Sequence, residues 1–426
     1  MTSEKPTEAY VWTWLPGATE PVVAGRLVER GDLVSFSYGQ SYLSLDDAVP
    51  LYLPELPLRR GRTDPPGNRN IAGVIEDAGP DAWGQRVVMR HLMGRDAGKA
   101  DPTELTQLTY LLESGSDRTG SLDFQRSGDV YVPRSDGSPS LEELAEAAER
   151  VEEGVPLSPD LDRALLHGSS VGGARPKALL SNGKRKLIAK FSSTTDTYPV
   201  VKGEFIAMEL ARRSGLNAAG VSYLEILGRD VLLVERFDRR AVDSGFLRLA
   251  SVSALTILEL DGVREGRYAT YYDLAEKIRT SFSEPQATLR ELFSRIVFNI
   301  LVGNIDDHAR NHRAFWDGGS RVLTLTPAYD ICPQPRSGRT ASQVMAFAPN
   351  IRESQLEPAV RAAGLYLLTE HEAREIIDHQ VESISTAWEE VADLASLSAQ
   401  DRDFFKGRQF LNPYGFEGYS SSSPWD

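Results

Sequence analysis

One short stretch of the chain gathers several side chains that could do chemistry, Gly303-Asn-Ile-Asp-Asp-His-Ala-Arg-Asn-His312. It follows a strongly apolar run, and the end of a buried helix can hold polar groups in fixed positions. Asp306 and Asn311 are five positions apart, and Asp330 follows later in Tyr329-Asp-Ile-Cys, after a strand-like run. A carboxylate can orient a hydroxyl nucleophile and accept its proton, and Asn and Asp supply the oxygens that magnesium prefers. This order of residues predicts a phosphoryl-transfer site.

A second set of residues, earlier in the chain, has the types that bind a nucleotide. Gly168-Ser-Ser-Val-Gly-Gly-Ala-Arg-Pro-Lys177 contains two adjacent glycines, whose backbone N–H groups can approach phosphate oxygens closely. Lys190 lies in a strand-like run, and Glu204 opens the helical pattern that follows. A strand lysine paired with a helix glutamate positions ATP phosphates in kinases. The run Leu233-Val-Glu-Arg-Phe-Asp238 ends the last strand of this region, where a hinge could hold adenine.

The residues around these motifs predict a small antiparallel sheet with one helix. Two strand-like runs flank Asn182-Gly183, and Asn-Gly is the pair that most strongly favours a two-residue hairpin turn. A helical pattern covers 204–214, and a second strand pair surrounds Gly228-Arg229-Asp230. This order of hairpin, helix and hairpin would place the Gly-rich loop, Lys190 and the hinge in one small lobe.

From about residue 250 the sequence becomes helical. Apolar residues recur at helical spacing between 289 and 301, as in a buried core helix, and lead into the stretch that contains Asp306. Capping boxes at Thr288–Glu291 and Thr369–Glu372 predict the starts of two helices. A small β lobe followed by a helical lobe that carries Asp, Asn and Asp is the plan of a two-lobed kinase.

The ordered motifs resemble the HipA family, whose members are serine/threonine kinase toxins of bacterial type II toxin–antitoxin systems. The resemblance runs from about residue 10 to about residue 400, and Gly79-Pro-Asp-Ala-Trp-Gly-Gln85 is similar to part of the subdomain that precedes the kinase lobes in that family. Arg310 stands where many members have Lys, which keeps the positive charge. The segments that carry the resemblance are Ser170-Val-Gly-Gly-Ala-Arg-Pro-Lys177, Leu187-Ile-Ala-Lys-Phe-Ser192, Glu204-Phe-Ile-Ala-Met-Glu-Leu-Ala211, Glu235-Arg-Phe-Asp-Arg239, Asn304-Ile-Asp-Asp-His-Ala-Arg-Asn311 and Ala328-Tyr-Asp330.

The expected fold class is α+β. We predict a two-lobed protein-kinase-like fold, with a small antiparallel β lobe that carries a helix and an all-α C-terminal lobe, preceded by a β-rich N-terminal subdomain. The expected divisions are 1–125 for the N-terminal subdomain, 126–245 for the kinase N-lobe with phosphate loop and hinge, 246–412 for the all-α C-lobe with the catalytic loop, and 413–426 for a flexible tail.

The resemblance also implies roles for individual residues, with ATP and Mg²⁺ as cofactors. Asp306 would be the catalytic base, Asn311 and Asp330 would hold magnesium, and Lys190 would contact the ATP phosphates. His308 would lie beside the phosphates, where ordinary protein kinases have a lysine. The remaining nucleotide contacts would come from the phosphate loop with Val171, Gly172, Gly173, Ala174 and Lys177, and from the adenine-binding backbone of Glu235, Arg236 and Phe237.

A serine at the head of the phosphate loop is autophosphorylated in this family, which ejects the loop and inactivates the kinase. Ser170 is the matching position, and Ser169 is adjacent. The phosphate would add negative charge beside the nucleotide phosphates, and the repulsion would remodel a Gly-rich loop. A hydroxyl that caps the loop is the alternative role for Ser170.

The resemblance implies partners as well. The family phosphorylates proteins of translation, aminoacyl-tRNA synthetases among them, which slows growth and favours persistence. It also binds antitoxins with a DNA-binding helix-turn-helix, which are often basic and would suit this acidic chain. We find no helix-turn-helix in this sequence, so we expect DNA contact only through the antitoxin.

Three alternatives stay open. A metal hydrolase could use His308 and His312, although the His-Glu-x-x-His pattern is absent because Ala309 follows His308. A kinase could act on a small molecule or lipid. A non-catalytic protein could serve as a corepressor whose main task is to bind the antitoxin.

Composition excludes several other classes of protein. The chain has 426 residues, 41% hydrophobic and 25% charged, which is the balance of a soluble globular protein. Its longest apolar stretches fall far short of the roughly 18 residues of a membrane helix. Its one cysteine, Cys332, excludes an internal disulfide framework and a zinc site built on several thiolates. The net charge of −14 opposes broad attraction to nucleic acid. The N-terminus has no apolar core typical of a signal peptide, so we expect a cytoplasmic protein without a membrane partner.

Overall fold

The computed structural model describes residues 5–94, 100–134, 140–153, 155, 157–170, 175–262, 265–336 and 338–425. The chain forms two compact units. The first unit comprises residues 1–195, 225–252 and 315–321, and the second comprises residues 196–224, 253–314 and 322–426. The chain passes between the units five times, and three of these passages lie within strands, namely β8 (Val221–Ile226), β12 (Ser251–Ser253) and β13 (Arg313–Asp317).

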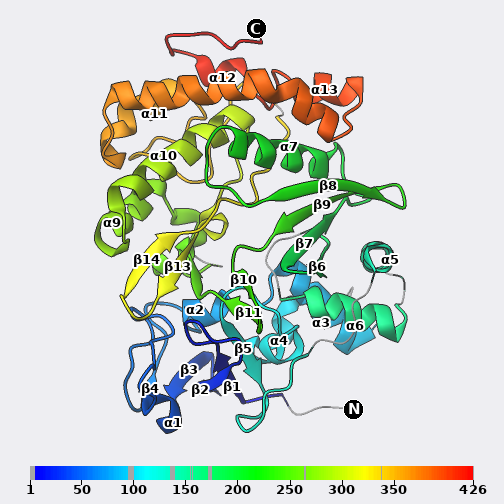
Figure 1. The fold of residues 1–426 in the computed structure, drawn as a ribbon, viewed down its shortest axis with the longest axis vertical. Helices are drawn as coiled ribbons and strands as arrows, with labels where there is room; N and C mark the ends of the chain where they lie inside the picture. The colour runs from blue at the N-terminus through cyan, green and yellow to red at the C-terminus, as the bar shows by residue number, and fades with distance from the viewer. Residues whose placement is uncertain are drawn as a thin grey trace. The chain divides into compact units, whose positions relative to one another are not determined.

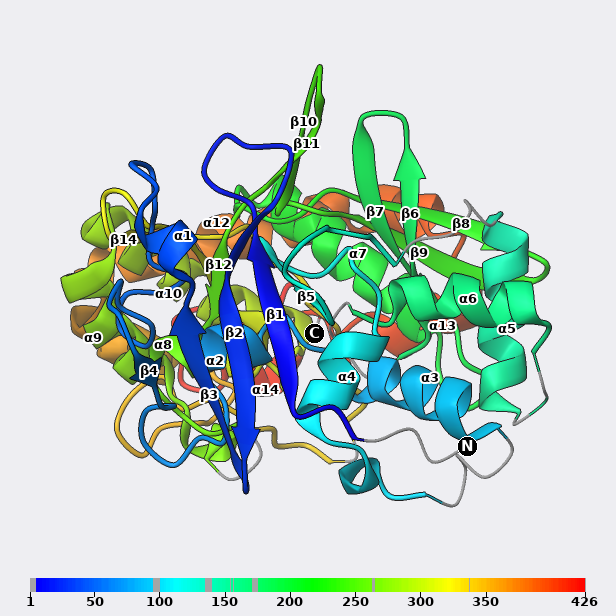
Figure 2. The ribbon, with the colours of Figure 1, turned by 90° about the horizontal axis from the view of Figure 1, so that it is seen from below.

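An antiparallel sheet of five strands forms the N-terminal part of the first unit (Figure 2). Buried apolar side chains such as Ala9, Val11 and Leu27 line one side of its central strands, so the predicted β-rich start of the chain is confirmed. The strand order is β4 (Arg62–Thr63), β3 (Leu33–Tyr38), β2 (Val22–Arg30), β1 (Glu8–Thr13) and β5 (Leu122–Gln125). The helices of this part are α1 (Gln40–Leu43), α2 (Gly73–Glu76), α3 (Ala82–Met93), the 3₁₀ turn η2 (Pro102–Glu104) and α4 (Gln107–Glu113).

The rest of the first unit contains the predicted hairpin around Asn182-Gly183. Gly183 has a φ of 57°, which a tight hairpin turn requires. The elements are α5 (Leu141–Glu152), α6 (Pro159–Gly168), β6 (Lys177–Asn182), β7 (Arg185–Phe191), β9 (Arg229–Glu235), β10 (Arg239–Val242) and β11 (Gly245–Arg248). Strand β7 lies between β6 and β9, and both of its neighbours are antiparallel to it.

The second unit is mainly helical (Figure 1). The all-α C-lobe that we expected over 246–412 is wrong in one respect, because β12, β13 and β14 (Val322–Leu325) form a three-stranded sheet within that range. Its longest helices are α10 (Pro285–Val302) and α12 (Glu370–Leu394), and α10 contacts both α9 (Tyr271–Ser281) and α12. Helix α7 (Val200–Arg213) also contacts α12. The remaining elements are α8 (Ala254–Ile257), η3 (Gly266–Tyr268), η4 (Ala309–Asn311), β14 (Val322–Leu325), α11 (Leu356–Ala362), η5 (Ala363–Tyr366), α13 (Ala399–Phe405) and α14 (Pro413–Phe416).

Two helix starts show where local patterns succeed and fail. The Thr369 box is confirmed, because Thr369 Oγ1 accepts from the Glu372 N–H at 3.2 Å and Glu372 Oε2 accepts from the Thr369 N–H at 2.8 Å. The Thr288 box is wrong, since α10 already begins at Pro285. Proline is well suited to a first helical position, because its φ is preset and its missing N–H would have no partner there.

The end of the chain differs from the flexible tail that we expected at 413–426. Residues 413–416 form α14, and Ser423 is buried. The Trp425 ring centroid lies 5.2 Å from that of Trp388 on α12. Aromatic contacts of this kind favour an ordered position over a solvated one.

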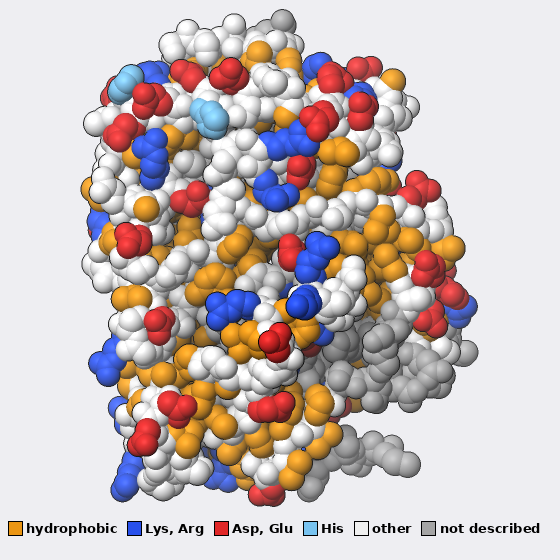
Figure 3. Space-filling model, viewed as in Figure 1, with side chains coloured by type: hydrophobic (Ala, Val, Ile, Leu, Met, Phe, Trp, Pro, Cys, Tyr) orange, Lys and Arg blue, Asp and Glu red, His pale blue; other side chains and the backbone are white. Residues whose placement is uncertain are grey.

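Among the described residues, no helix combines the length and the hydrophobicity needed to cross a membrane. Figure 3 shows one face of the protein, on which acidic and basic side chains are interspersed among hydrophobic ones.

Candidate functional site

The end of α10 places the predicted catalytic loop. Gly303 terminates the helix with a φ of 69°, and a Cβ there would lie 2.8 Å from the Gln409 carbonyl oxygen. Only glycine combines that left-handed backbone with so close an approach. The Asn304 N–H then donates to the Asn299 carbonyl at 2.9 Å, and the two side-chain amides are also joined at 2.9 Å. The loop therefore leaves the helix in one defined direction.

Asp307 is the buried anchor of this loop. Its Oδ2 lies 2.7 Å from His312 Nε2 and accepts from Asn299 Nδ2 at 2.8 Å and from the Tyr271 hydroxyl. Burial alone would raise the pKa of Asp307, but attraction to His312 and hydrogen bonds from His312 and Tyr271 lower it. Burial and the neighbouring Asp307 raise the pKa of Tyr271 well above its ordinary value, so the phenol keeps its proton and donates.

The predicted reactive residues lie on this anchored loop. Asp306, directly before the anchor, is exposed, whereas His308 is half-buried and Asn311 is buried on η4. The Asp306 carboxylate is thus open to solvent while its neighbour is held from three sides. Such an arrangement presents a carboxylate on a rigid support, which a general base needs.

Two hydrogen bonds to main-chain carbonyls join the loop to the segment that contains Asp330. The Tyr329 hydroxyl donates to the Arg310 carbonyl at 2.6 Å, and the Gln334 N–H donates to the Gly303 carbonyl at 2.9 Å. The structure therefore brings the segments of Asn311 and Asp330 together. Asp330 itself is half-buried and has a φ of 61°, a strained conformation that persists only where the surroundings enforce it.

These two residues suit magnesium by their chemistry. Asn311 offers an amide oxygen and Asp330 a carboxylate oxygen, and Mg²⁺ takes hard oxygen donors while keeping room for phosphate and water. His312 does not suit the alternative of a metal hydrolase, because its side chain is only 4% exposed. In addition, the described residues contain no group of three or more His, Cys, Asp or Glu side chains that could hold a metal ion.

The first unit carries the residues predicted to bind ATP. Lys190 on β7 pairs in register with Lys177 on β6 and with Leu232 on β9. Residues directly opposite in an antiparallel pair point to the same face, so the two lysines share one face of the sheet. Their surroundings differ, since Lys190 is half-buried, whereas the Lys177 side chain is 1% exposed and its Nζ lies 2.9 Å from Asp81 Oδ2.

The predicted hinge is held by one backbone hydrogen bond and by contacts of its side chains. The Arg236 N–H donates to the Lys186 carbonyl at 2.9 Å, so this N–H is occupied within the sheet. The Arg236 side chain is buried, whereas Glu235 and Phe237 are half-buried. The Phe237 ring lies edge-on to that of Phe315, with centroids 5.9 Å apart.

The head of the phosphate loop lies at the end of α6. The Ser169 hydroxyl donates to the Leu166 carbonyl at 2.6 Å and accepts from the Gly115 N–H at 3.4 Å. Ser170 is 1% exposed, and within the described part of the chain its Oγ makes no hydrogen bond, so a capping role for this hydroxyl is not seen there. The predicted loop residues Val171, Gly172, Gly173 and Ala174 lie outside the described residues.

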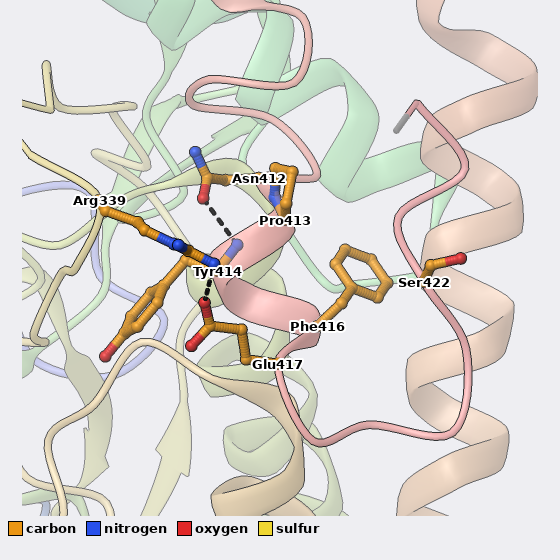
Figure 4. A pocket seen from close by; sticks show the side chains of 7 residues that line it. All are labelled: Arg339, Asn412, Pro413, Tyr414, Phe416, Glu417 and Ser422. Atoms are coloured by element: carbon orange, nitrogen blue, oxygen red, sulfur yellow. Dashed lines mark hydrogen bonds and ion pairs between the residues drawn. The ribbon is translucent and has the colours of Figure 1, made fainter.

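A surface pocket of about 540 Å³ lies elsewhere in the second unit (Figure 4). None of the predicted site residues that the structure describes lines it. Its Arg339 is already paired with Glu417 at 3.1 Å, and Asn412 Oδ1 accepts from the Tyr414 N–H at 3.0 Å (Figure 4). Its lining residues are Arg339, Asn412, Pro413, Tyr414, Phe416, Glu417 and Ser422.

Two structural features around the predicted site escaped the sequence patterns. The Asp307 anchor combines side chains from α9, α10 and the loop, and its one signal is Asn299, a polar residue inside an apolar helix. The contact of Asp81 with Lys177 joins positions 96 apart. Asp81 stands before a helical pattern, so its sequence signal indicates only a helix cap.

Comparisons with known proteins agree with this arrangement. Residues 169–388 match the family described as the HipA-like C-terminal domain. The serine/threonine-protein kinase toxin HipA of Shewanella oneidensis is 31% identical over 189 residues, which cover 38% of this chain and 42% of that protein. A second relative, from Sinorhizobium fredii, is 26% identical over 231 residues, or 51% of this chain and 52% of that protein. The chain thus spans about half the length of these relatives.

The fold is similar over a much longer stretch. A Shewanella oneidensis structure of HipA with HipB and operator DNA covers 90% of this chain and 92% of the solved chain, with a TM-score of 0.66 and 20% identity. The two-lobed HipA-like fold expected from the motifs is therefore confirmed. The family match spans more than half of the chain, so this protein belongs to the HipA family.

Proposed function

We propose that this protein is a kinase that transfers the γ-phosphate of ATP to serine or threonine in a protein substrate. The observation that carries the proposal is the contrast between two adjacent carboxylates. Asp307 is buried and bound by Tyr271, Asn299 and His312, and this support leaves Asp306 exposed on the same loop. Asp306 would orient the substrate hydroxyl and accept its proton as the phosphoryl group is transferred.

The remaining roles, which are binding of magnesium, the phosphates and adenine, fall to residues of both units. Bound magnesium would neutralise charge on the phosphates, and Asn311 with Asp330 would hold it. Lys190 and His308 would contact the phosphates, and the backbone at Glu235–Phe237 would bind adenine. The support for this assignment is residue type together with position: on β7 for Lys190, at the end of β9 for the hinge, and on the anchored loop for the rest.

Regulation and partners belong to the same proposal. Phosphorylation of Ser170 by the protein itself would inactivate it, and a DNA-binding antitoxin of the HipB type would neutralise it. The similar Shewanella structure contains HipA with HipB and operator DNA, which supports such a partner. The net charge of −14 favours a basic partner protein over direct DNA contact. The substrate would be a protein of translation, such as an aminoacyl-tRNA synthetase.

A test uses intact mass and peptide mapping of purified protein before and after incubation with ATP and magnesium. Wild type is compared with Asp306→Asn and with Asp403→Asn, a matched change at an exposed carboxylate on α13. We expect phosphate on wild type and Asp403→Asn and none on Asp306→Asn. An active Asp306→Asn variant contradicts the role of Asp306 as the base.

The starting mass separates the remaining outcomes. A wild-type protein that already carries phosphate as purified has reacted in the cell, and its Asp306→Asn form should then lack that phosphate. A wild-type protein that starts unmodified, gains no phosphate and binds no ATP contradicts the kinase proposal and favours the non-catalytic corepressor.

A further inference from the structure

The N-terminal section, defined here as residues 1–125, contacts the predicted nucleotide-binding segments at two places within the first unit. The first contact is the start of α3 at Asp81–Gly84, which lies against the chain on both sides of the predicted phosphate loop. The second is the turn Asp117–Gly120, which lies against the predicted hinge. Neither segment belongs to the predicted nucleotide site.

The start of α3 holds one chain segment before the loop and one after it. A Cβ on Gly84 would lie 1.8 Å from the Ser169 carbonyl oxygen, so the helix and Ser169 approach as closely as glycine permits. On the other side, the indole N–H of Trp83 donates to the Lys177 carbonyl at 3.3 Å, and Trp83 is 1% exposed. The start of α3 thereby contacts one segment on each side of the predicted phosphate loop, at Ser169 and at Lys177.

One carboxylate serves both the helix and the loop. Asp81 Oδ1 accepts from the Gly84 N–H at 2.9 Å as the cap of α3, and its Oδ2 pairs with Lys177 Nζ at 2.9 Å. A buried lysine ammonium needs such a partner, because an unpaired buried charge is strongly disfavoured. The Lys177 ammonium is therefore bound to the N-terminal section through Asp81, and its side chain is 1% exposed, whereas Lys190 opposite it is half-buried.

The hinge is tied to the N-terminal section by a buried network. Arg236 donates to the carbonyl oxygens of Asp117 at 3.0 Å and Arg118 at 2.7 Å. In the other direction, Asp238 Oδ2 accepts from the Gly120 N–H at 2.8 Å. Bonds from backbone to side chain in both directions leave little freedom for the hinge to shift relative to this turn.

We propose that the N-terminal section positions the nucleotide-binding segments, and that Lys177 is an anchor bound to Asp81 and not a ligand of the ATP phosphates. This inference rests on the proposed kinase function and deepens it, because it assigns an ATP-positioning task to residues outside the kinase lobes. Asp81 and Asp117 are positioning residues in this scheme. Ser169 and Lys177, which flank the predicted Gly-rich stretch, then depend on α3 for their positions.

The test is a double-mutant cycle on Asp81 and Lys177. Binding of ATP with magnesium is measured by calorimetry, and kcat and KM for ATP are measured by phosphotransfer. The variants are Asp81→Asn, Lys177→Met and the pair together. The matched control is Asp101→Asn, because Asp101 also caps a helical turn of the N-terminal section, with its Oδ1 2.8 Å from the Thr103 N–H, but is exposed.

We expect each single change to raise Kd and KM for ATP by about tenfold with a smaller change in kcat, and the double variant to be no worse than the poorer single one, because the two residues act as a unit. Asp101→Asn should behave as wild type. If Lys177 were a phosphate ligand, Asp81→Asn would free it and leave ATP binding unchanged or tighter. That result, or additive losses in the double variant, overturns the proposal.

A further variant distinguishes a loss of ATP positioning from a loss of folding. Asp81→Glu keeps the negative charge but lengthens the side chain, so it should fold, displace Lys177 and raise KM for ATP; an unchanged KM with an unchanged melting temperature overturns the proposal. Wild-type protein that binds no ATP contradicts the kinase function itself. Wild-type protein that binds ATP, beside an Asp81→Asn variant that binds it equally well, contradicts the positioning role alone.

Discussion

His312 Nε2 lies 2.7 Å from Asp307 Oδ2, and this contact is buried, with both side chains about 5% exposed or less. An ionised carboxylate only accepts hydrogen bonds, so Nε2 carries the hydrogen. The pair closes the loop from Asp307 to His312 into a fixed turn. Asp306 and Asp307 are identical in type and adjacent in sequence, but Asp306 is exposed whereas Asp307 is buried.

We therefore expect opposite consequences from removing the two carboxylates. Asp307→Ala leaves His312, Asn299 and the Tyr271 hydroxyl without their shared acceptor, which should cost about 3–5 kcal/mol of folding free energy. Asp306→Ala removes an exposed side chain and should change stability by less than about 0.5 kcal/mol while abolishing phosphotransfer. Urea unfolding and a phosphotransfer assay on both variants check this; equal stability losses would contradict the anchor.

Gly303→Ala should destabilise the protein and disturb the catalytic loop. Gly303 has a φ of 69°, and a Cβ would lie 2.8 Å from the Gln409 carbonyl oxygen, so both strain and a clash oppose alanine. The expected loss is about 1–3 kcal/mol. Gly364→Ala is the matched control, since it has open space and no positive φ. Thermal unfolding of both variants tests the difference, and similar melting temperatures would count against it.

Lys190→Ala should weaken ATP binding. Loss of a charge-assisted contact to phosphate costs about 1.5–3 kcal/mol, which corresponds to roughly 10- to 100-fold in Kd. Lys184→Ala, at an exposed position in the same hairpin, provides the control for general charge effects. Calorimetric titration with ATP and magnesium gives the answer, and an unchanged Kd for Lys190→Ala would refute its role.

The two serines at the end of α6 should respond differently to alanine. Ser169→Ala loses the bond to the Leu166 carbonyl and should cost about 1 kcal/mol of stability. Ser170→Ala loses no hydrogen bond seen among the described residues, so its stability should change little, but it should block self-phosphorylation. Peptide mapping and thermal unfolding together test this, and phosphate mapped to another residue would overturn the choice of Ser170.

Acid should weaken the buried network at the hinge. Burial alone would raise the pKa of Asp238, but Arg236 and Arg239 hold it at about 2, below its ordinary value of 3.8. The folded state thus stays ionised while the unfolded chain takes up a proton. The contribution of Asp238, about 2 kcal/mol, is present above pH 3.8 and is lost as the pH falls toward 2.

The measurement is the free energy of unfolding in urea between pH 5 and 2. Nearby arginines also lower the pKa values of Asp117 and Asp123, so the protonation of these two residues contributes to the same loss of stability in acid. Asp238→Asn should be less stable at pH 5 and should lose less stability than wild type toward pH 2. If the free energy of unfolding fell equally in the two proteins between pH 5 and 2, the contribution of Asp238 to the network would be contradicted.

Local sequence patterns were sufficient for several elements and for the order of the motifs, but they misplaced the start of α10 and missed α14. Asn182-Gly183 encodes its turn through backbone conformation, and the Thr369 box encodes a helix start through two side-chain bonds within one turn of chain. The apolar spacing of α10 likewise encodes a buried helix. These signals act over a few residues, so a single sequence contains them in full.

The sequence by itself determined which residue types follow one another, and therefore the family and the candidate chemistry. Only the tertiary structure decided which of two adjacent carboxylates is exposed, because the partners of Asp307 include Tyr271, 36 positions away. It also decided that Lys177 pairs with Asp81, at a separation of 96 positions. Burial and pairing depend on how distant segments pack, and neither residue type nor local spacing encodes that packing.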